Sequence, residues 1–227
     1  MLPDAFVSCS YLLIGCGSSI HRLINHSHEH FSKVLPEFVC AAAGIAAIGA
    51  RCLFNLGYNL LWREYPIDPL LIEADIKSQS NERNIIDSGL SVFGLASLIY
   101  SLYHHHNYQT TGVIIISSLS LAEIICMHAE LKSRSQTPPD DPSTNHLRYL
   151  ISVVDGCLTW LWIFSSAIFG WAMENGYARL ATVPCIISML IYRPNGFYHG
   201  WSIRNCLMDY MMLAYVILMT EAICQSS

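Results

Sequence analysis

Long apolar stretches alternate with short polar segments along almost the whole chain. A helix that crosses a bilayer needs about 17–25 mainly apolar residues, so these stretches predict membrane-spanning helices. We predict spans over Ala5–Leu23, Pro36–Leu61, Ile85–Tyr103, Thr110–His128, Leu147–Met173, Ala178–Tyr192 and Asn205–Cys224. The first stretch is diluted by serine and glycine, so six spans are the alternative to seven. The predicted fold is an all-α membrane protein, a helix bundle in a single domain over residues 1–227.

A stripe of polar residues interrupts the second predicted helix. Arg51, Asn55 and Asn59 recur at every fourth position and therefore share one helical face. Groups of this kind must point at protein or water, because lipid leaves them unsatisfied. Asp155 is the acidic residue nearest in depth to Arg51, and Asp87 is the second. These five residues form either a structural ion pair with interhelical hydrogen bonds or a binding site for a small solute, an ion or a proton.

Small residues on the same helix predict a place near the centre of the bundle. Gly44 and Gly49 lie among Ala43, Ala47 and Ala50. Small side chains let helix backbones approach each other closely in a membrane. We therefore expect other helices to pack directly against this one.

Composition supports the membrane prediction and excludes several other classes. The chain of 227 residues is 53% hydrophobic and only 13% charged, with a mean hydropathy of +0.38, whereas soluble domains carry about twice that charged fraction. The net charge of −5 leaves no basic surface for nucleic acid. The nine cysteines form no CxxC pair and sit mostly in apolar runs, which favours buried thiols over a disulfide framework. The expected partner is the lipid bilayer, with a small-molecule or ion ligand as an addition and protein partners unspecified.

Basic residues predict the orientation in the membrane. Eight Lys and Arg residues fall on the N-terminal side of the predicted spans and three on the other side, with Arg51 inside. Because cytoplasmic loops are enriched in Lys and Arg, the N-terminus is predicted to be cytoplasmic and the C-terminus lumenal or extracellular. The glycosylation sequon Asn25-His26-Ser27 lies in the first loop, on the predicted lumenal side. Span lengths near average fit either the secretory pathway or the cell surface.

Histidines gather in two predicted loops. His26, His28 and His30 alternate after the first helix, where imidazoles can take zinc or copper, although a solvated loop is the simpler interpretation. The run His104–His106 occupies the tip of the hairpin between the third and fourth spans. We interpret that run as interfacial polar residues that would respond to pH near the histidine pKa.

Local motifs give no catalytic set. The sequence contains no GxSxG, P-loop, HExxH or dinucleotide-binding fingerprint. We therefore predict neither catalytic residues nor a cofactor, with zinc as a minor alternative.

Three pieces of the sequence resemble the transmembrane protein 187 family, a group of seven-span proteins without an assigned activity. They are CLFNLGYNLLW in the second span, NIIDSGLSVFGLASLIYSLY in the third and HGWSIRNCLMDYMMLAYVILMT at the end. That family is similar in layout to the alkaline ceramidase and progestin-receptor-like superfamily, whose hydrolases hold zinc with three histidines. The resemblance matches Asp87 and His199 to that metal site, but the second histidine of the last span is replaced by Ile203. It therefore implies a degenerate relative.

Three functions follow as hypotheses. The first is a non-enzymatic membrane protein whose polar groups serve packing, partner binding or ligand binding. The second is a transporter or channel that uses the polar cluster of the second span. The third is a membrane hydrolase of the ceramidase type. Convergence of the polar cluster on an open cavity would favour transport, and histidines converging from several spans would favour catalysis.

Overall fold

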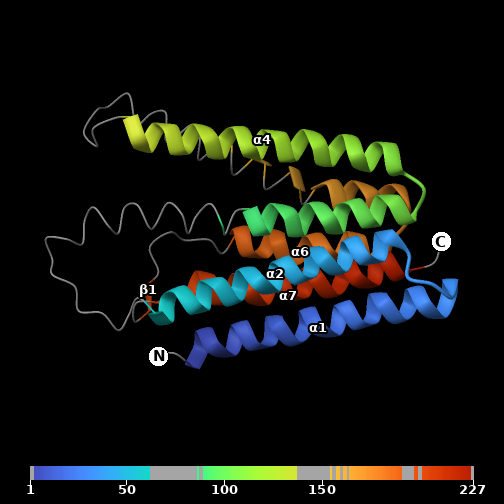
Figure 1. Ribbon diagram of the computed structural model, residues 1–227, viewed down its shortest axis with the longest axis horizontal. Helices are drawn as coiled ribbons and strands as arrows, with labels where there is room; N and C mark the ends of the chain where they lie inside the picture. The colour runs from blue at the N-terminus through green and yellow to red at the C-terminus, as the bar shows by residue number, and fades with distance from the viewer. Residues whose placement is uncertain are drawn as a thin grey trace, which may run out of the picture.

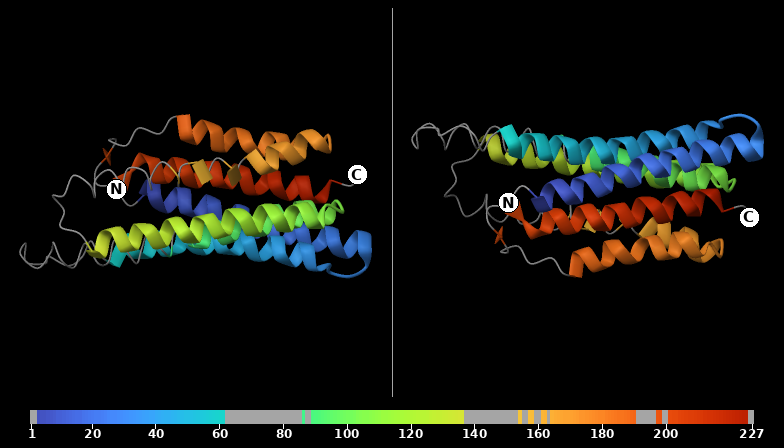
Figure 2. Two further views of the ribbon diagram at one scale, coloured as in Figure 1. Left: turned by 90° about the horizontal axis from the view of Figure 1, so that it is seen from above. Right: turned by 90° about the horizontal axis from the view of Figure 1, so that it is seen from below.

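The computed structural model describes residues 3–61, 86, 89–136, 154, 157–158, 161–162, 164–190, 197–198 and 201–225. Its helices run side by side in alternating directions (Figure 1), and the N- and C-termini lie at opposite ends of the bundle. Two further views keep this arrangement and place α6 at one edge (Figure 2). The predicted helix bundle is confirmed for the described residues, while the number of membrane crossings stays a prediction.

The helices follow the predicted order. They are α1 (Pro3–Phe31), α2 (Pro36–Leu61), a helix over residues 89–105, α4 (Gln109–Gln136), a helical segment over residues 164–172, α6 (Gly176–Leu190) and α7 (Ile203–Cys224). A short hairpin that was not predicted precedes α7, in which β1 (Phe197–Tyr198) pairs antiparallel with β2 (Trp201–Ser202).

Helix α2 begins and ends at the predicted residues, whereas α1 is two turns longer than predicted. Pro36 suits the first position of a helix, where an N–H has no partner anyway. In α1 the segment with His26, His28 and His30 was expected to be a loop, and that prediction is wrong. No glycine or proline interrupts the helix there. The helix ends at Phe31, and the next residue, Ser32, has a left-handed φ of 54° and donates its N–H to the His28 carbonyl at 2.9 Å.

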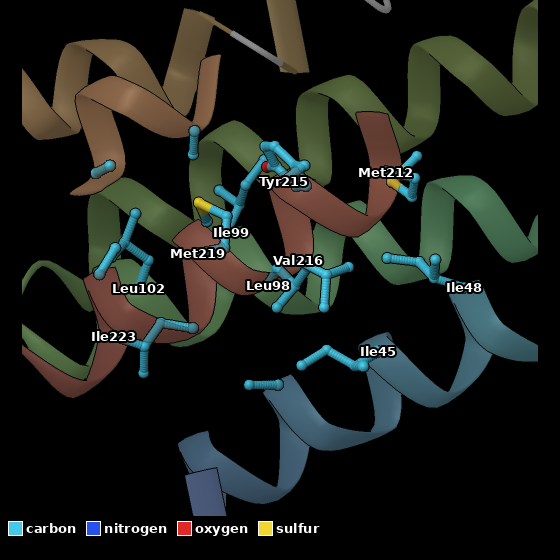
Figure 3. Close-up of a cluster of buried hydrophobic side chains, with 14 of the residues drawn as sticks. Ile45, Ile48, Leu98, Ile99, Leu102, Met212, Tyr215, Val216, Met219 and Ile223 are labelled. Atoms are coloured by element: carbon cyan, nitrogen blue, oxygen red, sulfur yellow. The ribbon is translucent and has the colours of Figure 1, made fainter. Parts of the chain in front are cut away.

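The buried core connects α2, α7 and the helix over residues 89–105. Apolar side chains from these helices meet along the bundle axis (Figure 3). Helix α7 also packs against α1 and α6, and α1 packs against α2. The bulkiest residues that α7 buries fully are Tyr215, Met219 and Ile223. Thus α7 shares the interior with α2, which the small residues had placed there.

Two glycines set the closest contact between α2 and its neighbour. A Cβ added to Gly44 would lie 2.6 Å from the Ser97 Cβ and 2.8 Å from the Gly94 carbonyl oxygen. A Cβ added to Gly94 would lie 2.6 Å from the Ile48 Cγ1. The two backbones therefore touch where neither residue has a side chain, as the small residues of α2 predicted.

Three of the described helices are long and apolar enough to cross a membrane. These segments are Pro36–Gly57, Gln109–Ala129 and Cys206–Cys224. The segment in α4 is the least buried of the three. Its exposed side chains are large and apolar, and they include Val113, Ile114, Leu121, Ile124 and Ile125. An apolar surface of this kind suits lipid and not water. These features indicate an integral membrane protein.

The glycine contact predicts a matched pair of stability effects. Gly44→Ala should destabilise the protein by about 1–3 kcal/mol, because its methyl group meets backbone that cannot rotate away. Gly57→Ala, on the same helix and with nothing within 4 Å, should be neutral or stabilise by about 0.5–1 kcal/mol. Unfolding midpoints of the detergent-solubilised variants measure both, and equal midpoints would contradict the assigned contact.

Candidate functional site

The predicted polar stripe of α2 is described only in part. Arg51 and Asn55 are partly buried. The side chain of Asn59, together with Asp87 and Asp155, lies outside the described residues. The pairing of Arg51 with Asp155 and the convergence of all five residues therefore stay predictions.

A polar contact that sequence reasoning missed joins α1, α2 and α7. The Ser8 hydroxyl donates a hydrogen bond of 2.8 Å to Oδ2 of Asp209. The thiols of Cys9 and Cys52 hydrogen-bond to each other. The Asp209 carboxylate is close enough to interact electrostatically with both thiols. We call Ser8, Cys9, Cys52 and Asp209 the polar seam. Serine was interpreted as a dilution of the first span, but Ser8 is fully buried and binds a carboxylate.

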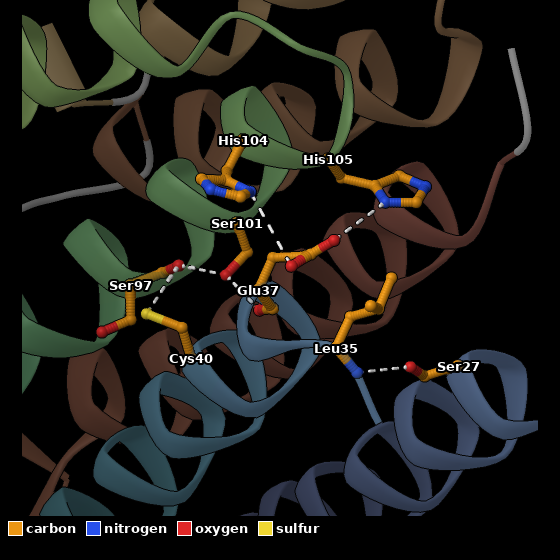
Figure 4. Close-up of polar contacts among 8 residues, drawn as sticks. All are labelled: Ser27, Leu35, Glu37, Cys40, Ser97, Ser101, His104 and His105. Atoms are coloured by element: carbon orange, nitrogen blue, oxygen red, sulfur yellow. Dashed lines mark hydrogen bonds and ion pairs between the residues drawn. The ribbon is translucent and has the colours of Figure 1, made fainter. Parts of the chain in front are cut away.

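A second polar group lies at the opposite end of the bundle. Glu37, in the first turn of α2, faces two histidines at the end of the helix over residues 89–105 (Figure 4). Its Oε2 lies 3.7 Å from Nδ1 of His104, and its Oε1 lies 3.9 Å from Nδ1 of His105. These distances are within ion-pair range but too long for hydrogen bonds. We call Glu37, His26, His104, His105 and His106 the histidine cluster.

Aromatic rings surround the cluster. The His105 ring packs edge-on against Phe38, with centroids 5.0 Å apart, and against Phe31, with centroids 6.0 Å apart. Phe38 also contacts His26 at 5.7 Å, which connects α1 to the same group. The cluster is thus formed by α1, α2 and the hairpin that begins at His104.

Hydrogen bonds to the backbone hold these elements in place. The Ser101 hydroxyl lies 2.8 Å from the Glu37 carbonyl oxygen and 2.7 Å from the Ser97 carbonyl oxygen, and its single hydrogen is shared between these two acceptors. The Ser27 hydroxyl donates to the Lys33 carbonyl at 3.0 Å and accepts the Leu35 N–H at 2.9 Å. The C-terminal end of α1 and the N-terminal end of α2 are therefore bonded to each other, and α2 is bonded to the helix over residues 89–105, next to the buried Glu37 carboxylate.

Burial makes three of the histidines weaker bases. It lowers the pKa of His26, His105 and His106 below the ordinary value of 6.5, because burial disfavours a charged imidazolium. The neighbouring His106 and His26 lower the pKa of His105 further, and the Glu37 carboxylate partly offsets this. For His106, the Ala222 carbonyl acts in the same offsetting direction. The folded end is therefore stabilised with these imidazoles neutral.

The interfacial position of the hairpin histidines stays a prediction, and their side chains are largely covered by protein. The His104 and His105 side chains are only 25% and 13% exposed, and His106 is buried. Tight turns pack the hairpin against α2 and α7, so its polar residues lie under neighbouring helices. The predicted topology puts the first loop and the histidine hairpin on the same side of the membrane. Glu37 follows the first loop directly, so its position was the available sequence signal for a contact with these histidines.

The weak candidates for metal ligands are brought together only in part. His26 is buried, whereas His28 and His30 are exposed, and a spacing of two residues puts His28 on another helical face. The His26 and His30 rings do contact each other, with centroids 4.3 Å apart. Within the described residues, no group of three or more His, Cys, Asp or Glu is placed to hold a metal ion. His199, the remaining weak candidate, lies outside them.

The polar seam predicts another matched pair. Ser8→Ala removes a buried hydrogen bond to a carboxylate and should destabilise the protein by about 1.5–3 kcal/mol. Ser118→Ala should change stability little, because Ser118 is exposed and donates only to the Ile115 carbonyl of its own helix. Denaturant midpoints in one detergent provide the comparison. If the Ser8 variant were as stable as the Ser118 variant, the seam would not stabilise the fold.

Comparison with known proteins identifies no relative of this chain. No protein-family model, curated protein or solved structure matches this chain. The resemblance to the transmembrane protein 187 family therefore stays a prediction, and the geometry described above carries the functional argument.

Proposed function

We propose that this chain is a non-enzymatic, multi-pass membrane protein whose polar groups serve helix packing and the binding of a partner or small ligand. The observation that carries the proposal is that several of its buried polar side chains bond to distant helices. Besides Ser8 with Asp209, Tyr103 donates to the Ser165 carbonyl at 3.0 Å and Asn175 donates to the Ala222 carbonyl at 2.9 Å. Each bond joins segments far apart in the sequence, as interhelical hydrogen bonds do in membrane bundles.

Two features support seven crossings, including one by α1. The inward face of α1 is buried against α2 and α7, and its outward face exposes Phe6, Tyr11 and Ile14, which suits contact with lipid. The termini lie at opposite ends of the bundle (Figure 1), as an odd number of crossings requires. On this basis α1 is the first span, in spite of its serines.

Aromatic residues support a membrane surface at the end that carries the C-terminus. Trp171 is 71% exposed, and the Arg179 guanidinium lies 4.7 Å from the centroid of its ring. Tyr108, before α4, and Tyr177, in the first turn of α6, lie at the same end and are also exposed. Trp, Tyr and Arg of this kind are enriched at the headgroup level. The histidine cluster would then lie close to the water on the predicted lumenal side.

Transport is the second candidate, and Asp209 favours it. A carboxylate between three helices can bind a cation or a proton inside the membrane. The hydrogen bond from Ser8 agrees equally with a packing role. A degenerate relationship to ceramidase-type hydrolases is the third candidate and rests on the sequence resemblance alone.

Reconstituted protein separates these candidates. We expect wild-type proteoliposomes to show the same fluxes of protons, cations and anions as empty liposomes. We also expect no hydrolysis of a lipid amide, with or without added zinc. Asp209→Asn should lower thermal stability and leave these baselines unchanged, because the proposed role of the carboxylate is structural. A flux that Asp155→Asn or Asp209→Asn abolishes would establish transport instead.

Orientation has its own test in intact cells. Lys33→Cys, in the first loop, and Gln225→Cys, after α7, are both exposed positions at one end of the bundle. In a background with Cys157→Ser, because Cys157 is exposed, we expect both new thiols to react with a membrane-impermeant maleimide only from the lumenal or extracellular side. Labelling from the cytoplasmic side would reverse the orientation, and labelling of the two thiols from opposite sides would contradict the bundle.

A further inference from the structure

The histidine cluster has the composition of a proton-binding site. Glu37 is buried, and the two nearest imidazoles are on a different helix. Nδ1 of His104 is itself buried and has no hydrogen-bond partner among the described residues. At 3.7–3.9 Å, these contacts become charge-assisted hydrogen bonds only after a proton is added and the groups move closer. The distances between Glu37 and the two imidazoles are therefore expected to change when the site takes up a proton.

Other titratable groups face the same site from each packed element. From α1 come His26 and His30, whose rings contact each other at an interplanar angle of 43°. The hairpin helix contributes Tyr100, whose ring lies 5.2 Å from that of His104, and His106, whose ring lies 5.3 Å from that of His105. Further out, Arg22, Glu29 and Glu221 act on His26. Most of the groups close to Glu37 are thus imidazoles.

The charge balance determines what protons do here. The Glu37 carboxylate offsets only part of the cost of a positive charge on His105, because burial and the neighbouring histidines lower the pKa of that imidazole overall. Each further proton adds a positive charge among buried histidines, where like charges repel and burial removes solvation. Because α1, α2 and the hairpin meet at this point, that repulsion separates three elements at one end of the bundle.

We propose that Glu37, His104 and His105 form a proton-binding site that opens this end of the bundle when the surrounding compartment becomes acidic. The site would face the lumen or the cell exterior, so the physiological setting rests on the orientation proposed above. The opening itself does not depend on that orientation.

The sign of the effect follows from the lowered pKa values of His26, His105 and His106. An imidazole whose pKa in the folded state lies below 6.5 binds fewer protons when folded than when exposed. The packed end is therefore fully stable above about pH 6.5 and loses stability as the pH falls below that value. Glu37 counteracts this loss, so removal of its charge must move the opening to higher pH.

Hydrogen–deuterium exchange of the full chain in nanodiscs tests the proposal. After correction for the intrinsic exchange rate, protection over residues 32–38 and 104–109 should fall by about tenfold or more between about pH 7 and pH 5. Glu37→Gln should shift the midpoint of this loss to higher pH. His105→Phe should weaken or abolish the loss, because a phenyl ring fits between Phe31 and Phe38 without titrating. His128→Phe, an exposed histidine of α4 outside the cluster, should behave like wild type.

Several results would overturn the proposal. One is constant protection in the wild type across this pH range. Another is a full response in His105→Phe, or a shift to lower pH in Glu37→Gln. A response that disappears when EDTA is added would assign the cluster to a metal ion and not to protons. If Glu37→Gln fails to fold, the wild type and His105→Phe still decide the question. The flux and hydrolysis assays are independent of this result, so failure of either proposal is recognised separately.

Discussion

A polar group inside a membrane bundle has no water to bind, so another part of the chain must satisfy it. This constraint explains the arrangement of α1, which contains several serines. Ser8 and Ser27 are both fully buried, and each bonds to a different element: Ser8 to a carboxylate of α7 and Ser27 to the backbone that leads into α2. Residues that lower the hydropathy of α1 thus attach it to the rest of the bundle.

The same constraint gives one carbonyl of α7 a connecting role. The Ala222 carbonyl accepts a hydrogen bond of 2.9 Å from the Asn175 side chain and lies 3.5 Å from Nε2 of His106. Asn175 in turn caps α6, because its Oδ1 accepts the Ala178 N–H at 2.9 Å. The hairpin after His104, the turn before α6 and the end of α7 are thereby joined at one point. A movement of the hairpin would therefore also affect the turn before α6 and the end of α7.

The two polar groups of the bundle differ in environment and therefore in the chemistry they allow. The polar seam lies between packed helices and holds a carboxylate through a hydroxyl, which suits a fixed packing role. The histidine cluster lies where helices end, beside turns formed by Ser32 and Asn107, both with positive φ. Imidazoles near water exchange protons within the physiological pH range. An arrangement of this kind provides one rigid part and one part that responds to its surroundings.

The sequence by itself determined the class of protein, the order of the helices and the exact extent of α2, because apolar length and a proline start are local properties. It also predicted close packing at Gly44 from residue size alone. It did not determine that Asp209 meets Ser8 or that Glu37 lies between two histidines, since those contacts join residues about 200 and about 67 positions apart. A serine in α1 or a histidine in a hairpin interacts with solvent when it is exposed and with other helices when it is buried. Only the packing of one helix on another decided which of the two applied, because burial depends on neighbours that local sequence does not specify.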